Sequence, residues 1–147
     1  IGPDGLYQDD LFKGATCDAV LATDLRMTFA SLPFEKMKGI GASTYENYKK
    51  KFGKEPTSYA LYSAEAARIA IDGIKRAAAD IEKGANPQAK REAVRKAIAG
   101  LKNYEGLNGK FSFDENGDTT SETMSGFKVV KSDKDPGCTF AFESILE

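Results

Sequence analysis

Apolar residues recur at helical spacing in three stretches of the chain, and each stretch predicts a helix. In the first stretch, Ser43 and Glu46 form a capping-box pattern that predicts the helix start, and Gly53 predicts its end. In the third stretch, Asn86 followed by Pro87 predicts an N-cap, and one apolar stripe continues as far as residue 101. The middle of the chain is therefore predicted to be helical.

The second and longest of these stretches is rich in alanine. Thr57 or Ser58 can cap this helix, which is predicted to reach about Ala79. Its spacing predicts an inward face made of Tyr59, Leu61, Tyr62, Ala66, Ile69, Ala70 and Ile74. The charged residues are predicted to lie on the solvent side, paired at i,i+4: Arg68, Asp72 and Arg76.

The last part of the chain changes to a period of two, which is typical of β-strands. Alternation is clearest in residues 110–113 and 139–142, and residues 126–131 add a further apolar run. The stretches 114–118 and 132–137 are rich in Asp, Asn, Gly and Pro, and they are predicted to be turns.

The first forty residues predict short elements. Residues 1–5 are typical of a strand end that enters a tight turn, and residues 6–14 predict a short helix with Leu11 and Phe12 facing inward. The apolar run 19–22 predicts a short strand. Residues 24–41 show no period and predict a connection, with one helical turn at 34–38.

The composition indicates a globular domain without a strongly charged partner. Of the 147 residues 41% are hydrophobic, and 21 Lys and Arg nearly balance 22 Asp and Glu, which leaves a net charge of −1. Nucleic acid is therefore not expected as a partner. No apolar run approaches the roughly 20 residues that a membrane-spanning helix needs.

The absence of histidine and the small number of cysteines remove much of enzyme chemistry. Without histidine the chain lacks the usual general base near neutral pH and the usual zinc ligand. Two cysteines, Cys17 and Cys138, are too few for a four-ligand metal site and too far apart for a C-x-x-C motif. They can form one structural disulfide or remain two buried thiols. No enzymatic activity, cofactor or metal is expected.

Two charged motifs have structural interpretations. Residues 114–118 resemble the start of an EF-hand calcium loop, but Thr119 and Ser125 occupy the positions where that loop requires Gly and Glu. A hairpin or strand-exit turn is the favoured interpretation. The run 49–51 of three lysines lies on a helix with aromatic residues on its inward face, and this pattern is typical of a solvated surface.

Two other features are candidates for a binding site. In open α/β sheets ligands bind beyond the carboxyl ends of strands, where Asp4 in the first turn can meet an amino group. Tyr59 lies in the first turn of the longest predicted helix, and from there an aromatic ring can project into a cleft. Each feature alone is also typical of an ordinary turn or of a residue at the rim of a core.

Four short motifs follow one another along most of the chain. They are Gly2-Pro3-Asp4-Gly5, Tyr48-x-x-x-Phe52-Gly53-Lys54-Glu55-Pro56, Tyr59-Ala60-x-Tyr62-x-Ala64, and Gly106-x-x-Gly109-Lys110-Phe111-x-Phe113-Asp114-x-x-Gly117-Asp118. In this order and at these spacings the chain resembles the periplasmic-binding-protein type I family, in particular its Leu/Ile/Val-binding branch. The resemblance implies the C-terminal portion of a two-lobed α/β fold with incomplete sheets, hence a truncation of a longer precursor.

The resemblance also implies how the chain is divided. Residues 1–25 and 126–147 would belong to the C-terminal lobe, and residues 30–120 to the N-terminal lobe. Residues 24–33 and 119–127 would be the crossings between the lobes. Three crossings join the lobes in this family, and two of them would lie in this chain.

The expected function is that of a solute-binding component of an ABC importer. By the resemblance, Asp4 would pair with the ammonium group of an amino acid, with Gly5 and Tyr7 beside it, and Tyr59 would contact the ligand side chain. Asp at position 4, where Glu is more common, shortens the reach of the carboxylate. Ligand contacts to both lobes would favour the closed form of a hinged protein.

The resemblance further implies a location and partners. The protein would be periplasmic, or extracellular and lipid-anchored, after removal of a signal peptide from the precursor. Its partners would be an amino acid or a related small molecule, an ABC permease in the membrane, and the missing N-terminal part of the same protein. An extracellular sensory or regulatory domain of the same fold is the alternative, and a membrane helix after residue 147 would favour it.

Overall fold

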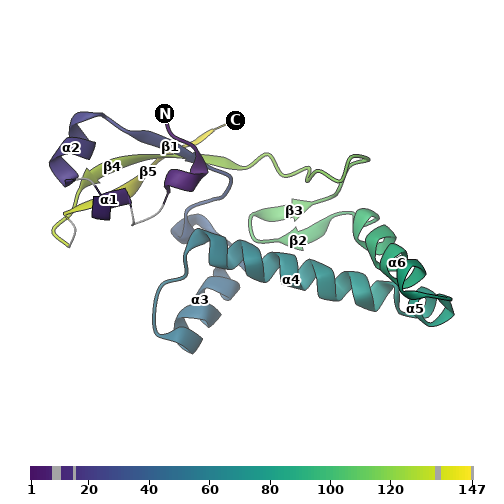
Figure 1. Ribbon diagram of the computed structural model, residues 1–147. Coiled ribbons are helices and arrows are strands. Elements are labelled where there is room, and N and C mark those ends of the chain that lie inside the picture. Colours follow the sequence, from purple (N-terminus) through teal and green to yellow (C-terminus); the bar gives the residue numbers. More distant parts are fainter. Residues whose placement is uncertain (8–10, 15, 135–136, 147) are drawn as a thin grey trace. The chain divides into compact units, whose positions relative to one another are not determined.

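The computed structural model describes residues 1–7, 11–14, 16–134 and 137–146, which form two compact units. Unit 1 is made of two chain segments, Ile1–Lys36 and Glu122–Glu147. Unit 2 is the continuous segment Met37–Ser121. Figure 1 labels the elements of both. Within the described residues, no helix is both long enough and apolar enough to cross a membrane.

Unit 1 is built on a three-stranded antiparallel sheet in the order β1-β4-β5. β1 (Arg26–Phe29) and β5 (Cys138–Leu146) both pair with the central β4 (Met124–Lys131), which has a register shift after its third residue. β4 and β5 fall where the period of two predicted strands. The prediction of a plain connection over 24–41 was wrong for β1, whose alternate residues Met27 and Phe29 are buried against β4.

Three short helices precede the sheet in unit 1. They are the 3-10 turn η1 (Asp4–Leu6), α1 (Leu11–Gly14) and α2 (Cys17–Ala22). α1 lies within the predicted helix 6–14, of which residues 8–10 lie outside the described part. The strand predicted at 19–22 was wrong, because that run belongs to α2. The Thr16 hydroxyl caps α2 by accepting the Ala19 N–H at 3.4 Å, and one apolar run of four cannot by itself distinguish the two structures.

The core of unit 1 joins its two chain segments. Phe12 and Val20 from the first segment pack with Val129 and Cys138 from the second, and all four are at least 91% buried. Leu11, Cys17, Leu21, Leu25 and Phe140 pack around this group. A last 3-10 turn, η2 (Phe34–Lys36), ends the first segment within the predicted helical turn 34–38.

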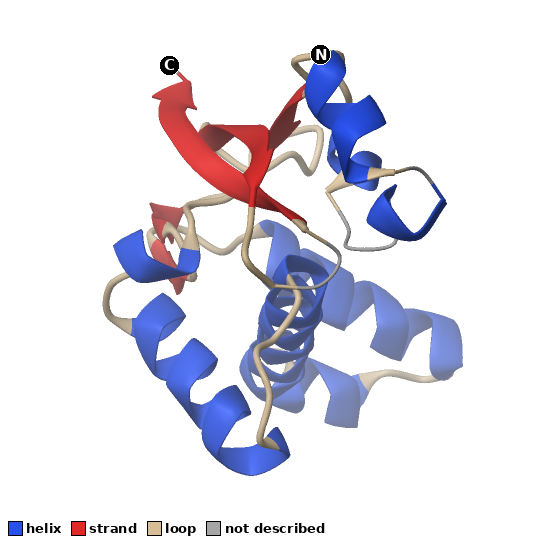
Figure 2. Ribbon diagram, turned by 90° about the vertical axis from the view of Figure 1, so that its left-hand side faces the viewer, coloured by secondary structure: helices blue, strands red, loops and turns tan. Residues whose placement is uncertain are grey.

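Unit 2 consists of four helices and a hairpin. Its helices are α3 (Ile40–Phe52), α4 (Ser58–Arg76), α5 (Ala78–Lys83) and α6 (Pro87–Ala99). Asn86 caps α6 by accepting the Ala89 N–H at 2.9 Å, and Gly53 ends α3 in the left-handed conformation, as the sequence predicts. Figure 2 shows these helices in blue and the short hairpin in red.

The start of α3 differs from the prediction. Ser43 does not cap the helix: the helix begins one turn earlier, after Gly39, and the Ser43 hydroxyl donates to the Ile40 carbonyl at 3.0 Å inside it. Gly41, in this added turn, is buried against the Leu107 carbonyl, where an added Cβ would overlap the oxygen. Tertiary packing of a glycine therefore extends the helix beyond its local capping signal.

The hairpin of β2 (Tyr104–Gly106) and β3 (Gly109–Phe111) packs on the helices of unit 2. Leu101, Tyr104 and Phe111 form a buried core with Ile69, Ile98 and Phe113 around it. At Gly73 on α4 the packing against α6 leaves no room for a side chain, because an added Cβ would overlap the Ile98 side chain. β3 lies at the start of the predicted strand 110–113, and β2 was not predicted.

α4 corrects the prediction of which helix side faces inward. Arg68 and Asp72 are half-buried and contact the hairpin, whereas Ile71 and Ile74 are each 52% exposed. Leu61, at 1% exposed, lies inward as predicted. The helical period identifies a stripe, but the neighbouring elements determine which stripe is covered.

Candidate functional site

The first turn of unit 1 is fixed to the sheet by backbone hydrogen bonds. The Gly2 N–H donates to the Arg26 carbonyl at 2.7 Å and the Thr28 N–H donates to the Gly2 carbonyl at 3.3 Å, so that Gly2 pairs with β1 in parallel orientation. The chain then enters η1, which is closed by the Tyr7 N–H donating to the Asp4 carbonyl at 2.8 Å. The turn therefore follows directly on a strand-like pairing, as the sequence predicts.

The side chain of Asp4 is exposed at the first position of η1. An added Cβ at the neighbouring Gly5 would meet no atom within 4 Å, so the turn presents an open surface beside this carboxylate. The structure thus brings Asp4 and Gly5 together at the end of the Gly2 pairing. Their contact with a ligand remains a prediction from the sequence.

Tyr7 anchors this turn to the sheet through its ring. The centroid of the Tyr7 ring lies 5.2 Å from that of Phe29 on β1, 4.5 Å from that of Phe127 on β4 and 4.9 Å from that of Phe140 on β5. Tilted aromatic pairs at such distances contribute to packing beyond the area that they bury. The half-buried ring of Tyr7 therefore holds η1 in place, and its predicted ligand contact remains untested.

Tyr59 belongs to unit 2 and lies in the first turn of α4. The Thr57 hydroxyl caps this helix by accepting the Ala60 N–H at 3.2 Å, and the ring of Tyr59 is 40% exposed. The Tyr59 carbonyl accepts the Ser63 hydroxyl at 2.9 Å, which fixes the backbone behind the ring. Tyr59 is therefore partly exposed at a capped helix start, and its contact with a ligand remains a prediction.

A polar contact between α4 and the β2–β3 hairpin was not predicted from the sequence. The Glu65 carboxylate accepts the Leu107 N–H at 2.6 Å, and the Asp72 carboxylate accepts the Tyr104 hydroxyl at 3.0 Å. Between them Arg68 donates to the Glu105 carbonyl at 3.3 Å and lies over the Tyr104 ring, with its centroid 5.7 Å away. Burial, followed by the hydrogen bond to Asp72, raises the pKa of Tyr104. This contact holds the hairpin at a fixed position along α4.

The polar contact between α4 and the hairpin has one signal in the sequence, the spacing of the polar residues on α4. Glu65, Arg68 and Asp72 recur at intervals of three and four on a helix whose other sides are rich in alanine. Such a row is usually interpreted as a solvated face, because only the folded structure shows that the hairpin covers it. The Arg68 Nη1 atom is buried and has no hydrogen-bond partner among the described residues.

The turn at residues 114–118 is closed by its own first residue. The Asp114 carboxylate accepts the Asn116 and Asp118 backbone N–H groups at 2.9 and 2.8 Å. The hydrogen bond from the Asp118 N–H, and to a smaller extent that from the Asn116 N–H, lowers the pKa of Asp114. Within the described residues, no three Cys, Asp or Glu side chains come together as metal ligands.

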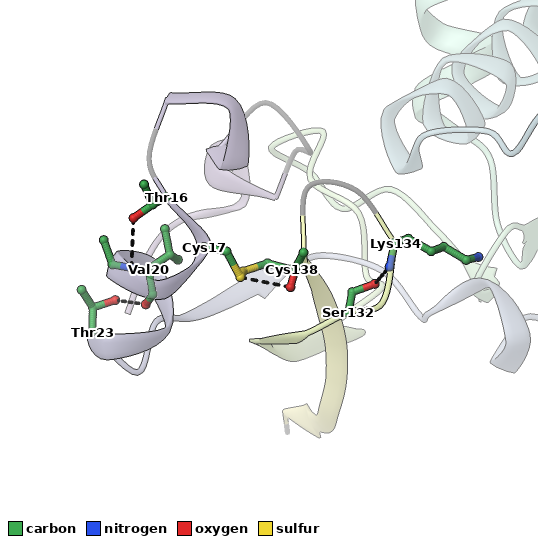
Figure 3. The surroundings of a disulfide bond; sticks show 9 residues. Thr16, Cys17, Val20, Thr23, Ser132, Lys134 and Cys138 are labelled. Atoms are coloured by element: carbon green, nitrogen blue, oxygen red, sulfur yellow. Dashed lines mark hydrogen bonds between the residues drawn. A yellow bond between two sulfur atoms is a disulfide. The ribbon is translucent and has the colours of Figure 1, made fainter.

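A disulfide joins Cys17 at the start of α2 to Cys138 at the start of β5 (Figure 3). The two Cα atoms are 5.6 Å apart, and the cysteines are separated by 121 positions in the sequence. Cys17 Sγ lies 3.1 Å from the Gly137 carbonyl oxygen, a polar contact because a disulfide sulfur carries no hydrogen to donate. Of the two alternatives that the sequence leaves open, the structure has the disulfide.

The fold defined by these units is that of the type I periplasmic binding proteins. The leucine-binding protein LivK of Thermotoga maritima superposes with a TM-score of 0.71 and 25% identity, over 98% of this chain and 36% of that chain. LivJ of Streptococcus pneumoniae is a branched-chain amino acid transporter substrate-binding protein in complex with isoleucine. It gives a TM-score of 0.64 and 15% identity, over 97% of this chain and 36% of that chain.

A periplasmic binding protein type 1 of Bordetella pertussis gives a TM-score of 0.67 and 21% identity, over 97% of this chain and 38% of that chain. Two of these three structural neighbours are named as leucine- or branched-chain amino acid-binding proteins, and the chain spans little more than a third of each of the three. No protein-family model matches the chain. No curated protein matches it either.

Proposed function

We propose that this chain is part of the solute-binding component of an ABC importer, which captures an amino acid or a related small molecule between two hinged lobes. One observation carries the proposal: 98% of the chain superposes on a leucine-binding protein at 25% identity. The proposed role is binding without chemical conversion of the ligand. The chain contains no histidine that could serve as a general base near neutral pH.

The two units would be parts of the two lobes. Unit 1 is discontinuous in sequence, because the chain leaves it at Lys36 and returns at Glu122. Such a division supports the assignment of residues 1–25 and 126–147 to the C-terminal lobe and of residues 30–120 to the N-terminal lobe. The predicted crossings at 24–33 and 119–127 include residues of β1 and β4, so the hinge segments would lie outside these strands, near Lys36 and Glu122, where the chain passes between the units.

The proposed ligand contacts come from one turn and one helix start. Asp4 would accept a charge-assisted hydrogen bond from the ligand ammonium group, beside the open surface at Gly5. Tyr59 would contact the ligand side chain from the first turn of α4. The firm attachment of both elements supports this role, because a preorganised contact loses little free energy to ordering when the ligand binds.

Uncovered apolar surface supports the proposal that an N-terminal part of the same protein completes the fold. Ile71 and Ile74 on α4 are each 52% exposed. A further apolar layer from the missing part would cover this face.

The disulfide supports a location outside the cytosol, since disulfides persist in oxidising compartments. The proposed location is therefore the periplasm, or the outer cell surface with a lipid anchor. An ABC permease in the membrane would be the partner that receives the ligand.

Calorimetric titration tests the proposed binding role in the protein that contains this chain and both complete lobes. The Asp4→Ala variant should bind leucine, or whichever amino acid the protein binds, about 10- to 150-fold more weakly, because a buried hydrogen bond to a charged group contributes about 1.5–3 kcal/mol. Asp133→Ala, at another exposed aspartate of unit 1, is the matched control and should bind normally. Equal affinities of both variants and the unchanged protein would exclude the role of Asp4.

A further inference from the structure

Unit 1 depends on contacts between two chain segments that are far apart in the sequence. Its first segment supplies η1, α1, α2 and β1, and its second supplies β4 and β5. Helices of three to six residues are not stable alone in water, because nucleation of a helix is unfavourable. The first segment is therefore ordered by its packing on the second.

The disulfide is the covalent link between these two segments. Cys138 is 4% exposed and belongs to the core cluster that joins Phe12 and Val20 to Val129, and Cys17 packs at its edge. Figure 3 shows the bond between the end of α2 that Thr16 caps and the start of β5. Unit 2, in contrast, is one continuous segment and contains neither of the two cysteines.

We propose that oxidation of Cys17 and Cys138 is the step that completes folding of unit 1, so that the Asp4 turn becomes ordered only in an oxidising compartment. The proposal rests on the proposed function as an exported binding protein. In the reaction, the two thiols lose two protons and two electrons and form one S–S bond. The electrons reduce the disulfide of a thiol oxidant, such as oxidised glutathione or a dithiol oxidase, to two thiols.

The effect follows from chain entropy. Closing a loop between residues 121 positions apart removes many conformations of the unfolded chain, and disulfides with long loops stabilise by a factor of about 30 to 5,000 in the folding equilibrium, or roughly 2–5 kcal/mol. Reduction should therefore open unit 1 first. η1 should open with it, because Tyr7 is held by rings on β1, β4 and β5, all within unit 1.

Hydrogen exchange measured by mass spectrometry tests the proposal on the protein that contains this chain and both complete lobes. Oxidised protein, protein reduced with dithiothreitol and the Cys17→Ser/Cys138→Ser variant should be compared. The β4 and β5 amides should exchange at least about 30-fold faster in the reduced protein and in the variant, whereas the α4 and α6 amides should change less than about threefold. Dithiothreitol should have no effect on the variant.

Several outcomes would overturn the proposal. These are unchanged exchange in β4 and β5 after reduction, equal acceleration in both units, or a variant that behaves like the oxidised protein. If the variant fails to fold, reduction of the unchanged protein still tests the proposal, because the exchange of the β4 and β5 amides can be compared with that of the α4 and α6 amides in the same sample. Exchange is measured without ligand, so failure to bind any amino acid would count against the proposed function and leave this result intact.

Discussion

Ser125 provides a sharp test of how the first segment of unit 1 is held beside β4. Its side chain is completely buried, and its hydroxyl donates to the Ser31 carbonyl at 2.6 Å. Ser125 is paired with Phe29 at the end of the β1–β4 ladder, so this bond extends the pairing beyond the last strand residue. It therefore joins the two chain segments where the first leaves β1 and the second enters β4.

Replacement of Ser125 by Ala removes the donor and leaves the acceptor buried. Ser31 is 3% exposed, so water cannot readily replace the lost hydroxyl. Loss of this buried hydrogen bond costs about 1–3 kcal/mol, and loss of one oxygen atom creates little cavity. Unit 1 of Ser125→Ala should therefore be less stable by about 1–3 kcal/mol. Native-state hydrogen exchange of the β4 amides measures this free energy.

Ser63→Ala is the matched control for this prediction. The Ser63 hydroxyl also donates to a backbone carbonyl, that of Tyr59, but the residue is exposed on α4. Surface substitutions of this kind change the free energy of unfolding by less than about 0.5 kcal/mol. A loss in Ser125→Ala no larger than that of the control would refute the reasoning from burial and geometry.

Two further predictions concern unit 2. Gly41→Ala should lower the free energy of unfolding of unit 2 by about 1–3 kcal/mol despite the higher helix propensity of alanine, because the Leu107 carbonyl is backbone and cannot rotate away. Urea unfolding measures this loss, and Ser63→Ala, at an exposed position of α4 in the same unit, should lose less than about 0.5 kcal/mol. The lowered pKa of Asp114 stabilises the folded state above the ordinary aspartate value of about 3.9, and this contribution is lost as the pH falls through the lower folded pKa. Asp114→Asn, which keeps an acceptor oxygen, should therefore reduce the dependence of the free energy of unfolding of unit 2 on pH below about pH 4. The same dependence in the variant and the unchanged protein would contradict the assignment of this effect to Asp114.

Local signals in the sequence predicted several helix ends correctly. Asn86 followed by Pro87 starts α6, Thr57 caps α4, and Gly53 ends α3, because each signal acts within one helical turn. The turn around Asp4 could also be predicted, since Gly and Pro restrict the backbone locally. The same motifs carry the resemblance to type I periplasmic binding proteins, which the structural comparison supports.

Other features depend on residues that are distant in the sequence. The run 19–22 becomes helix because α2 is capped by Thr16 and packs on the core of unit 1, and α3 begins early because Gly41 fits against the Leu107 carbonyl. The polar contact of Glu65 with the hairpin joins groups 42 positions apart. No local pattern contains that information.

The sequence by itself determined the order of most helices and strands, the absence of histidine chemistry and the placement of Asp4 and Tyr59 at element ends. The tertiary structure alone decided which side of α4 is covered, that Tyr7 packs on the sheet, and that Cys17 and Cys138 are joined. The reason is physical: caps and turns are set by bonds within a few residues, whereas burial and pairing depend on which distant segments meet.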